Sequence, residues 1–191
     1  SSAASDVYKR QAYYTNLNSY FIFARLCNLM ESLEKKVWWD YVEPDLQELF
    51  LQSVDLLRVT AALEEYHDYS FVVFPASKAY EGFLKKFFYD MGFIDEPDYY
   101  GTRFRVGKAL NPSIDAKETD NWWVYNKIVN YCSSNSLPDK LWAAWKKCRN
   151  EVFHWFPGQS KAISRDEARD CLIRIFDAMD EVFVACDIKV R

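Results

Sequence analysis

The sequence predicts an all-α fold, and three observations lead to that conclusion. Apolar residues recur every three or four positions over most of the chain, as they do on the buried face of a helix. Only 5 glycines and 6 prolines occur among 191 residues, so few positions interrupt a helix. Half of the residues are hydrophobic and 18% are aromatic, which at this length suffices for a core without disulfides or metal. We therefore expect one compact helical domain overall.

The amino-terminal part is expected to contain two helices. Residues 1–11 are interpreted as a translated sequencing adaptor, because residues 6–11 read Asp-Val-Tyr-Lys-Arg-Gln, and they are left out of the fold. The apolar spacing over residues 20–33 indicates one amphipathic helix. A Pro-Asp pair begins a second helix over residues 44–66. Residues 12–69 are thus predicted to pack as helices on the rest of the bundle.

The remaining helices follow from the same periodicity and from capping signals. We expect them over residues 76–91, 122–131, 138–156 and 164–186. Pro75 ends the apolar run before the first of these, and Gly92 follows its last turn. Ser164 and Glu167 have the spacing of a capping box at the start of the last helix.

One long irregular loop separates these helices. Residues 95–121 contain two Gly and two Pro, which break any helical period. Within the loop, polar and apolar residues alternate from Thr102 to Val106, as they do in a strand. We therefore expect a short hairpin inside this loop.

Charge and cysteine content exclude several classes of protein. The net charge of −4 excludes a generally basic protein that coats nucleic acid. Five cysteines without a Cys-x-x-Cys pair, and only two histidines, indicate neither a disulfide framework nor a zinc site. No apolar run approaches the roughly 18 residues of a membrane span. We expect a cytoplasmic protein with no metal, no cofactor and no membrane contact.

The segment from residue 141 to residue 157 contains the most informative pair of polar residues. Arg149 and His154 are five positions apart, which on an ideal helix separates them by about 140°. Asn150 and His154 are four apart and share a face. Near a helix end the long Arg side chain can bend toward the imidazole. The alternative is a solvated Arg beside a structural His at the carboxyl end of a helix.

This pattern resembles the sequence signature of a known family. The sequence Arg149-Asn150-x-x-x-His154 is similar to the Arg-x(4–6)-His signature of HEPN ribonucleases. Together with residues 80–87 and 105–111, it resembles the carboxy-terminal domain of the ribonuclease LS toxins. The resemblance implies a HEPN-like bundle over residues 70–191 that cleaves RNA without metal and leaves a 2′,3′-cyclic phosphate. It also implies a homodimer that acts as a toxin and is restrained by a protein antitoxin.

Four residues form the candidate catalytic site. His154 suits proton transfer near neutral pH, and Arg149 suits the charge of the phosphorane. Asn150 is expected to bind phosphate or the imidazole, and Glu81 to orient Arg149 or His154 from a neighbouring helix. The alternative for Glu81 is a boundary carboxylate, solvated or paired with Lys85.

A local basic surface is the expected RNA-binding region. It comprises Arg103, Arg105, Lys108, Lys146 and Lys147. Trp142 and Trp145 either stack on bases or, more commonly at this spacing, pack in the core. His67 is expected at the surface, outside the site. The alternative function is a HEPN-like module that dimerises and binds an antitoxin or RNA without cleaving it.

Overall fold

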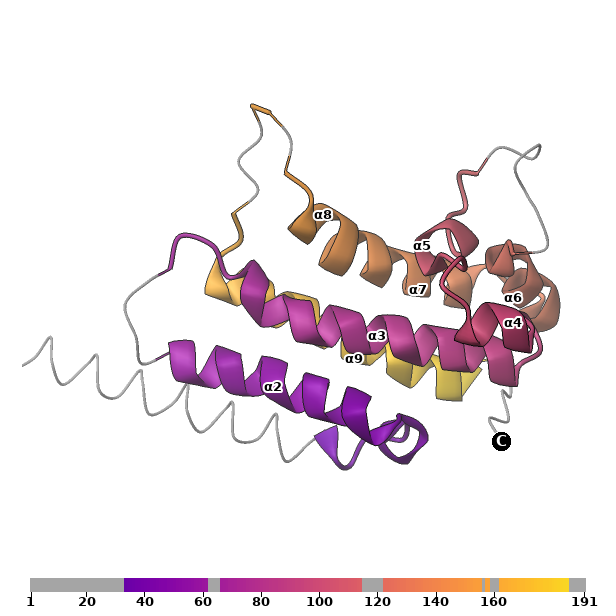
Figure 1. Cartoon of the computed structure of the whole chain (residues 1–191), viewed down its shortest axis with the longest axis horizontal. Coiled ribbons are helices and arrows are strands. Elements are labelled where there is room, and N and C mark those ends of the chain that lie inside the picture. The colour runs from indigo at the N-terminus through magenta and orange to yellow at the C-terminus, as the bar shows by residue number, and fades with distance from the viewer. Residues whose placement is uncertain (1–32, 62–65, 115–121, 156, 159–161, 186–191) are drawn as a thin grey trace, which may run out of the picture.

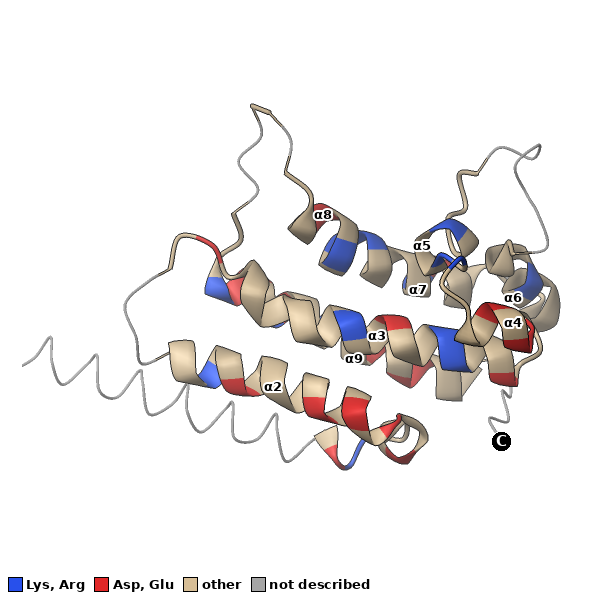
Figure 2. Ribbon diagram, in the orientation of Figure 1, with Lys and Arg blue, Asp and Glu red and all other residues tan. Residues whose placement is uncertain are grey.

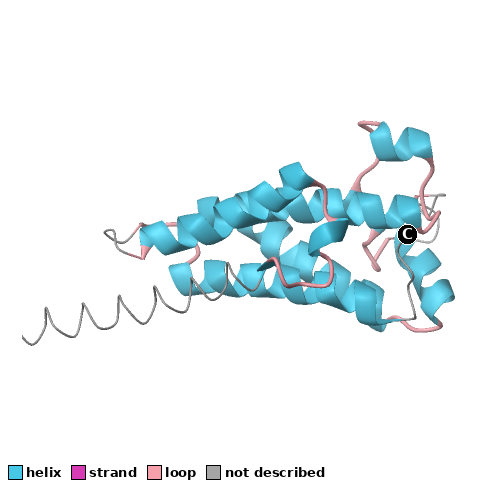
Figure 3. Cartoon of the chain, turned by 90° about the horizontal axis from the view of Figure 1, so that it is seen from below, coloured by secondary structure: helices cyan, strands magenta, loops and turns pink. Residues whose placement is uncertain are grey.

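The computed structural model describes residues 33–61, 66–114, 122–155, 157–158 and 162–185, and their regular structure is entirely helical (Figure 3). In chain order the elements are η1 (Trp39–Tyr41), α2 (Pro44–Thr60), α3 (Ser70–Asp90), α4 (Glu96–Tyr100), α5 (Val106–Ala109), α6 (Val124–Cys132), α7 (Ser136–Trp145), η2 (Lys146–Asn150), α8 (Glu151–Phe153) and α9 (Arg165–Val184). The predicted all-α class is confirmed. The adaptor at residues 1–11 and nearly all of the helix predicted over residues 20–33 lie outside the described residues.

The core lies between three long helices. α3 packs against both α2 and α9, and α7 also packs against α9 (Figure 1). At the centre, the rings of Trp38, Phe50 and Phe176 lie 5.5 to 5.8 Å apart and join the segment before η1 to α2 and α9. Residues on both sides of position 70 therefore contribute to one core. This packing fixes α3 as the scaffold on which the later helices lie.

The predicted start of α3 was wrong. The helix begins at Ser70 and includes Pro75, which the sequence placed before the helix. A proline inside a helix disturbs the hydrogen bonding of the preceding turn. Here the Ala76 backbone N–H donates to Oγ of Ser53 on α2, at 2.8 Å, and both groups are buried. The neighbouring helix thus supplies a hydrogen bond at the proline, and α3 continues through it.

The hairpin expected inside the long loop is also wrong. Among the described residues of this loop, the regular elements are the two short helices α4 and α5. Phe104 and Val106 are buried and Arg103 and Arg105 are exposed, so the alternation is real but has no partner strand there. The alternation of polar and apolar residues in this segment therefore arises because one side of the loop packs on the bundle and the other side faces solvent.

Two of the predicted helix boundaries are confirmed and one is not. The capping box is confirmed at α9, where Oγ of Ser164 accepts from the Glu167 N–H at 3.2 Å. Gly92, with φ of +68°, follows α3 as expected. The helix predicted over residues 44–66 ends earlier, at Thr60.

Asp68 ties the start of α3 to the start of α9. Its carboxylate accepts from the Ile163 N–H at 3.1 Å and from the hydroxyl and N–H of Ser70 at 2.7 and 3.1 Å. Burial raises the pKa of Asp68, but these hydrogen bonds outweigh burial and hold it below its usual value. Segments almost a hundred positions apart are therefore joined at this end of the bundle.

Candidate functional site

The segment with Arg149 and His154 is not the single helix that its spacing predicted. α7 ends at Trp145, a π-helical turn (η2) follows, and α8 ends at Phe153. His154 has extended backbone, with φ of −99° and ψ of 128°, so it lies just outside the helix. The predicted angle of about 140° between Arg149 and His154, and the shared face of Asn150 and His154, both assumed a continuous helix and do not apply. A π turn inside a helix is often associated with a functional site.

Arg149 is held by two neighbours. Its Nη2 atom lies 3.0 Å from Oε2 of Glu81, and its guanidinium carbon lies 4.5 Å from the centre of the Trp145 ring. The predicted contact between Glu81 and Arg149 is therefore present. Both side chains keep more than a third of their surface exposed, so the ion pair stabilises the fold by no more than about 1 kcal/mol. Its value lies in fixing the direction of the guanidinium.

Polar side chains on one face of α3 hold the segment in place. Ser77, Tyr80 and Glu81 follow one another at helical spacing, so they point the same way. The Ser77 hydroxyl donates to the Cys148 carbonyl at 2.8 Å, inside the π turn. The Tyr80 hydroxyl donates to the Leu141 carbonyl at 3.1 Å, and burial raises the pKa of Tyr80, which stays neutral.

The buried cysteine within the π turn, Cys148, is structural. The Cys148 thiol donates to the Cys171 carbonyl on α9 at 3.5 Å, and both residues are buried free thiols. The contact with Cys171 and burial raise the pKa of Cys148, so it is not a thiolate nucleophile. Cys132 takes part in a disulfide, whereas the cysteine content was interpreted as indicating no disulfide framework.

The other two predicted catalytic residues lie further along the segment. Asn150 is half-buried at the end of η2, and His154 is exposed at the beginning of the loop after α8. Of the two partners predicted for Glu81, Arg149 is the one that it contacts. The other, His154, follows Arg149 by five residues in the chain. The imidazole of His154 is exposed and therefore accessible to a substrate.

The predicted basic surface is assembled from two parts of the chain. All five of its residues are exposed: Arg103, Arg105, Lys108, Lys146 and Lys147. The two parts meet where Gly107 of α5 packs on the indole of Trp145 so closely that a Cβ there would lie 2.7 Å from Nε1. Trp145 is buried and so packs, as expected, while Trp142 is half-buried. Figure 2 shows Lys and Arg on α3, α5 and the α7–α8 segment, whereas α2 carries mainly Asp and Glu.

Two of the basic groups differ in what they offer a ligand. Lys147 pairs with Glu151 at 3.3 Å in a largely exposed contact. Arg105 donates to the carbonyls of Thr102 and Phe104 in its own loop, so part of its donor capacity stabilises that loop. Lys85, the alternative partner considered for Glu81, donates instead to the backbone carbonyl of Gly101 at 3.4 Å. Glu81 therefore pairs with Arg149.

Sequence reasoning missed Lys78 and the role of Trp145. Lys78 is exposed on α3, one turn before Glu81. Its position three residues before Glu81 was the only feature of the sequence that could have placed it near the site. Trp145 lies four residues before Arg149, which is the spacing of neighbours on a helix. That spacing was the available signal.

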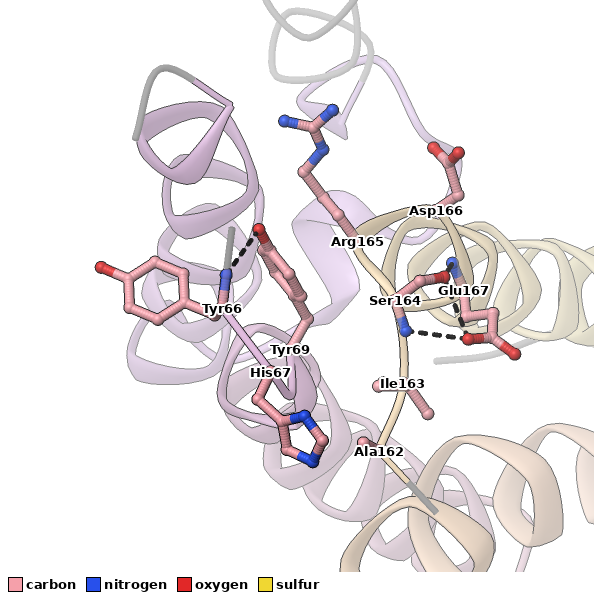
Figure 4. Close-up of a pocket in the computed structure, with 9 residues that line it drawn as sticks. All are labelled: Tyr66, His67, Tyr69, Ala162, Ile163, Ser164, Arg165, Asp166 and Glu167. Carbon is pink, nitrogen blue, oxygen red and sulfur yellow. Dashed lines mark hydrogen bonds between the residues drawn. The ribbon is translucent and has the colours of Figure 1, made fainter. Parts of the chain in front are cut away.

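A separate cavity of about 420 Å³ lies at the amino-terminal ends of α3 and α9 (Figure 4). Its lining residues are Tyr66, His67, Tyr69, Ala162, Ile163, Ser164, Arg165, Asp166 and Glu167. His67 is exposed at its edge, as expected of a surface histidine. The Tyr66 N–H donates to the Tyr69 hydroxyl at 3.3 Å, and Ser164 and Glu167 are engaged in the α9 cap.

The remaining observations concern metal-binding groups, membrane-spanning potential and relatives of the chain. Among the described residues, no three His, Cys, Asp or Glu side chains are grouped as a metal would require. No helix in this part of the chain has both the length and the apolar character to cross a bilayer. Comparisons with protein-family models, curated proteins and solved structures found no match to the chain.

Proposed function

We propose that this protein is a metal-independent endoribonuclease of the HEPN type. The observation that carries the proposal is the contact of 3.0 Å between Glu81 and Arg149. Sequence reasoning alone placed these two residues in one candidate site, although they lie 68 positions apart in the chain. That they are neighbours, with His154 close behind in the chain, supports reading them as one site.

In this mechanism the 2′-hydroxyl of a ribose attacks the adjacent phosphorus. The bond from phosphorus to the 5′-oxygen breaks, and a 2′,3′-cyclic phosphate and a 5′-hydroxyl are released. Arg149 stabilises the charge of the phosphorane, because Glu81 and the Trp145 ring hold its guanidinium in one direction. His154 transfers a proton, either from the 2′-hydroxyl or to the 5′-oxygen. In a homodimer the second subunit supplies a second His154, and one residue type then serves both proton transfers.

The biological role that we propose follows from the resemblance. The protein acts as a toxin or antiphage effector, and a protein antitoxin restrains it. The basic residues near Arg149, on a chain with a net charge of −4, give RNA or an acidic partner a local surface to bind. The reading frame next to the gene tests this role, since a small adjacent antitoxin gene is expected.

The test of the chemistry is incubation of RNA with the purified protein in EDTA. We expect cleavage products that end in a 2′,3′-cyclic phosphate. The variants Arg149→Ala and His154→Ala should each lower the rate by about 100-fold or more, with unchanged helical circular dichroism. The exposed residues Arg174 and His67 provide matched controls, and their alanine variants should cleave normally. Full cleavage by both site variants would reject the assignment.

A second test concerns Glu81, which contacts Arg149. The variant Glu81→Gln keeps the shape of the side chain but removes the charge that orients the guanidinium. We expect a lower rate across pH 5 to 9 with no displacement of the rate-versus-pH profile, because Glu81 contacts Arg149, whose charge does not titrate in this range. A profile displaced toward lower pH would instead show that Glu81 acts on His154.

The alternative proposal is a non-catalytic module that dimerises and binds an antitoxin or RNA. One observation favours it: Arg149 is already engaged by Glu81 and Trp145, as a purely structural arginine would be. Such a protein would bind RNA in EDTA and leave it intact.

A further inference from the structure

A stripe of α3 runs along the side of the candidate site. Its residues are spaced by three and four positions and lie on one face of the helix: Phe71, Phe74, Lys78, Glu81 and Lys85. The stripe runs antiparallel to the η2–α8 segment, because Phe74 contacts Phe153 while Glu81 contacts Arg149. Any substrate held at Arg149 and His154 therefore lies beside this stripe.

Phe74, near one end of the stripe, meets the end of the opposite segment, and we name three aromatic residues there the aromatic platform: Phe74 on α3, Phe153 on α8 and Trp155 just after α8. The rings of Phe74 and Phe153 lie 5.6 Å apart with an interplanar angle of 76°. Phe74 is 57% exposed and Trp155 is 77% exposed. Trp155 is two residues beyond Phe153, which limits their Cα separation to about 7 Å. His154 lies between them in the chain, so the platform borders the predicted proton-transfer group.

Two exposed lysines lie on the two segments that form the platform, α3 and η2–α8. Lys78 lies four residues, one turn, beyond Phe74 on the exposed stripe, and Lys146 is exposed on η2. Neither forms an ion pair with the residues that the structure describes. Exposed rings next to unpaired positive charge match the chemistry of a single nucleic-acid strand, in which unstacked bases alternate with phosphates.

We propose, on the basis of the proposed ribonuclease function, that the aromatic platform is a stacking subsite for unpaired bases of single-stranded RNA. Bases stack on Phe74 and Trp155, and Lys78 and Lys146 bind the phosphates that lead to Arg149. The preferred substrate is therefore single-stranded RNA, because the bases of a duplex are already stacked on each other.

A second copy of the chain is the competing occupant of the platform. A two-fold axis through this surface would bring the lysines of both copies to one interface, where like charges repel. An RNA strand between the two copies would neutralise these lysines. The charges therefore favour RNA over a bare protein contact.

The test measures binding separately from cleavage. Anisotropy of a labelled 2′-O-methyl RNA strand, which has no attacking 2′-hydroxyl, gives the Kd of the full chain. We expect Trp155→Ala and Phe74→Ala each to raise this Kd between about five- and 150-fold. Trp155→Phe should restore most of the affinity, because a ring face is retained. Tyr131→Ala, which removes an aromatic residue 50% exposed on α6, is the matched control and should bind normally.

Two further measurements make the outcomes distinct. The same sequence as a duplex should bind the wild type and both platform variants equally. Light scattering should give one molar mass for all of them. Unchanged single-strand affinity in both variants would overturn the proposal, and so would a change from dimer to monomer without loss of RNA affinity. A wild type that binds through the platform but cleaves nothing would refute the proposed ribonuclease function and leave the subsite standing.

Discussion

Replacing Gly107 by alanine tests whether α5 and Arg149 influence each other through the indole ring of Trp145, which contacts both. A Cβ at position 107 would lie 2.7 Å from Nε1 and 3.2 Å from Cε2 of Trp145. The closer approach is about 0.7 Å inside the 3.4 Å at which ordinary contact begins. Trp145 is only 2% exposed and its ring is rigid, so it cannot turn away. Either α5 or the indole must move.

The cost follows from the size of that overlap. Overpacking a well-packed site costs about 1 to 3 kcal/mol, and removing a glycine from a helix returns at most about 1 kcal/mol. Because neither group can yield easily, the upper part of that cost applies, about 2 to 3 kcal/mol, and the free energy of unfolding of Gly107→Ala should fall by about 1 to 2 kcal/mol after the helix term is subtracted. For a chain of this size that corresponds to a Tm lower by roughly 2 to 8 °C. RNA cleavage should fall as well, because the displaced indole carries the guanidinium of Arg149.

The assay is thermal unfolding followed by circular dichroism, with Gly82→Ala as the control. A Cβ at Gly82 would lie 2.5 Å from Cδ1 of Leu46, the end of a flexible and half-buried side chain. Leu46 can rotate, and α3 gains helix propensity, so this variant should melt at or above the wild-type temperature. A Gly107→Ala protein that melts with the wild type would refute the reasoning, as would equal losses in both variants.

Three other predictions concern the hydrogen bonds around the site and the assembly. Ser77→Ala leaves the buried Cys148 carbonyl without its donor, so the free energy of unfolding in urea should fall by about 1 to 3 kcal/mol; an unchanged midpoint and slope would contradict this. The folded-state pKa of Asp68 is lowered, so its carboxylate stabilises the fold above its ordinary pKa of about 4 and this contribution is lost as pH falls through the folded value. The stability of the wild type should therefore exceed that of Asp68→Asn at pH 6, and the difference should narrow in acid; a constant difference would exclude the linkage. Light scattering should give a homodimer, and a protein that stays monomeric at high micromolar concentration yet cleaves RNA would defeat the mechanism with one His154 from each subunit.

Features with local causes were predictable from the sequence. The capping box at Ser164 and Glu167 needs only two residues three positions apart, and α9 begins there. Gly92 follows α3 because a positive φ is easy for glycine. The all-α class followed from the spacing of apolar residues, which does not depend on how the helices pack.

Features that depend on a distant partner were not predictable. The start of α3 was placed too late, because continuing through Pro75 uses a hydrogen bond to Ser53 on another helix. The hairpin was predicted from an alternation that was real, but a strand needs a second strand, and α4 and α5 lie on either side of that segment instead. Periodicity records which side of a segment is buried and not what buries it.

The candidate site shows the same division. The sequence alone determined the residue types, an arginine and a histidine late in a helical domain and a carboxylate on an earlier helix. The tertiary structure decided that Glu81 contacts Arg149, that Trp145 lies under the guanidinium, and that a π turn held by Ser77 separates α7 from α8. The physical reason is that these contacts join residues far apart in the chain, such as the Ser77 hydroxyl and the Cys148 carbonyl 71 positions away, so no local pattern encodes them.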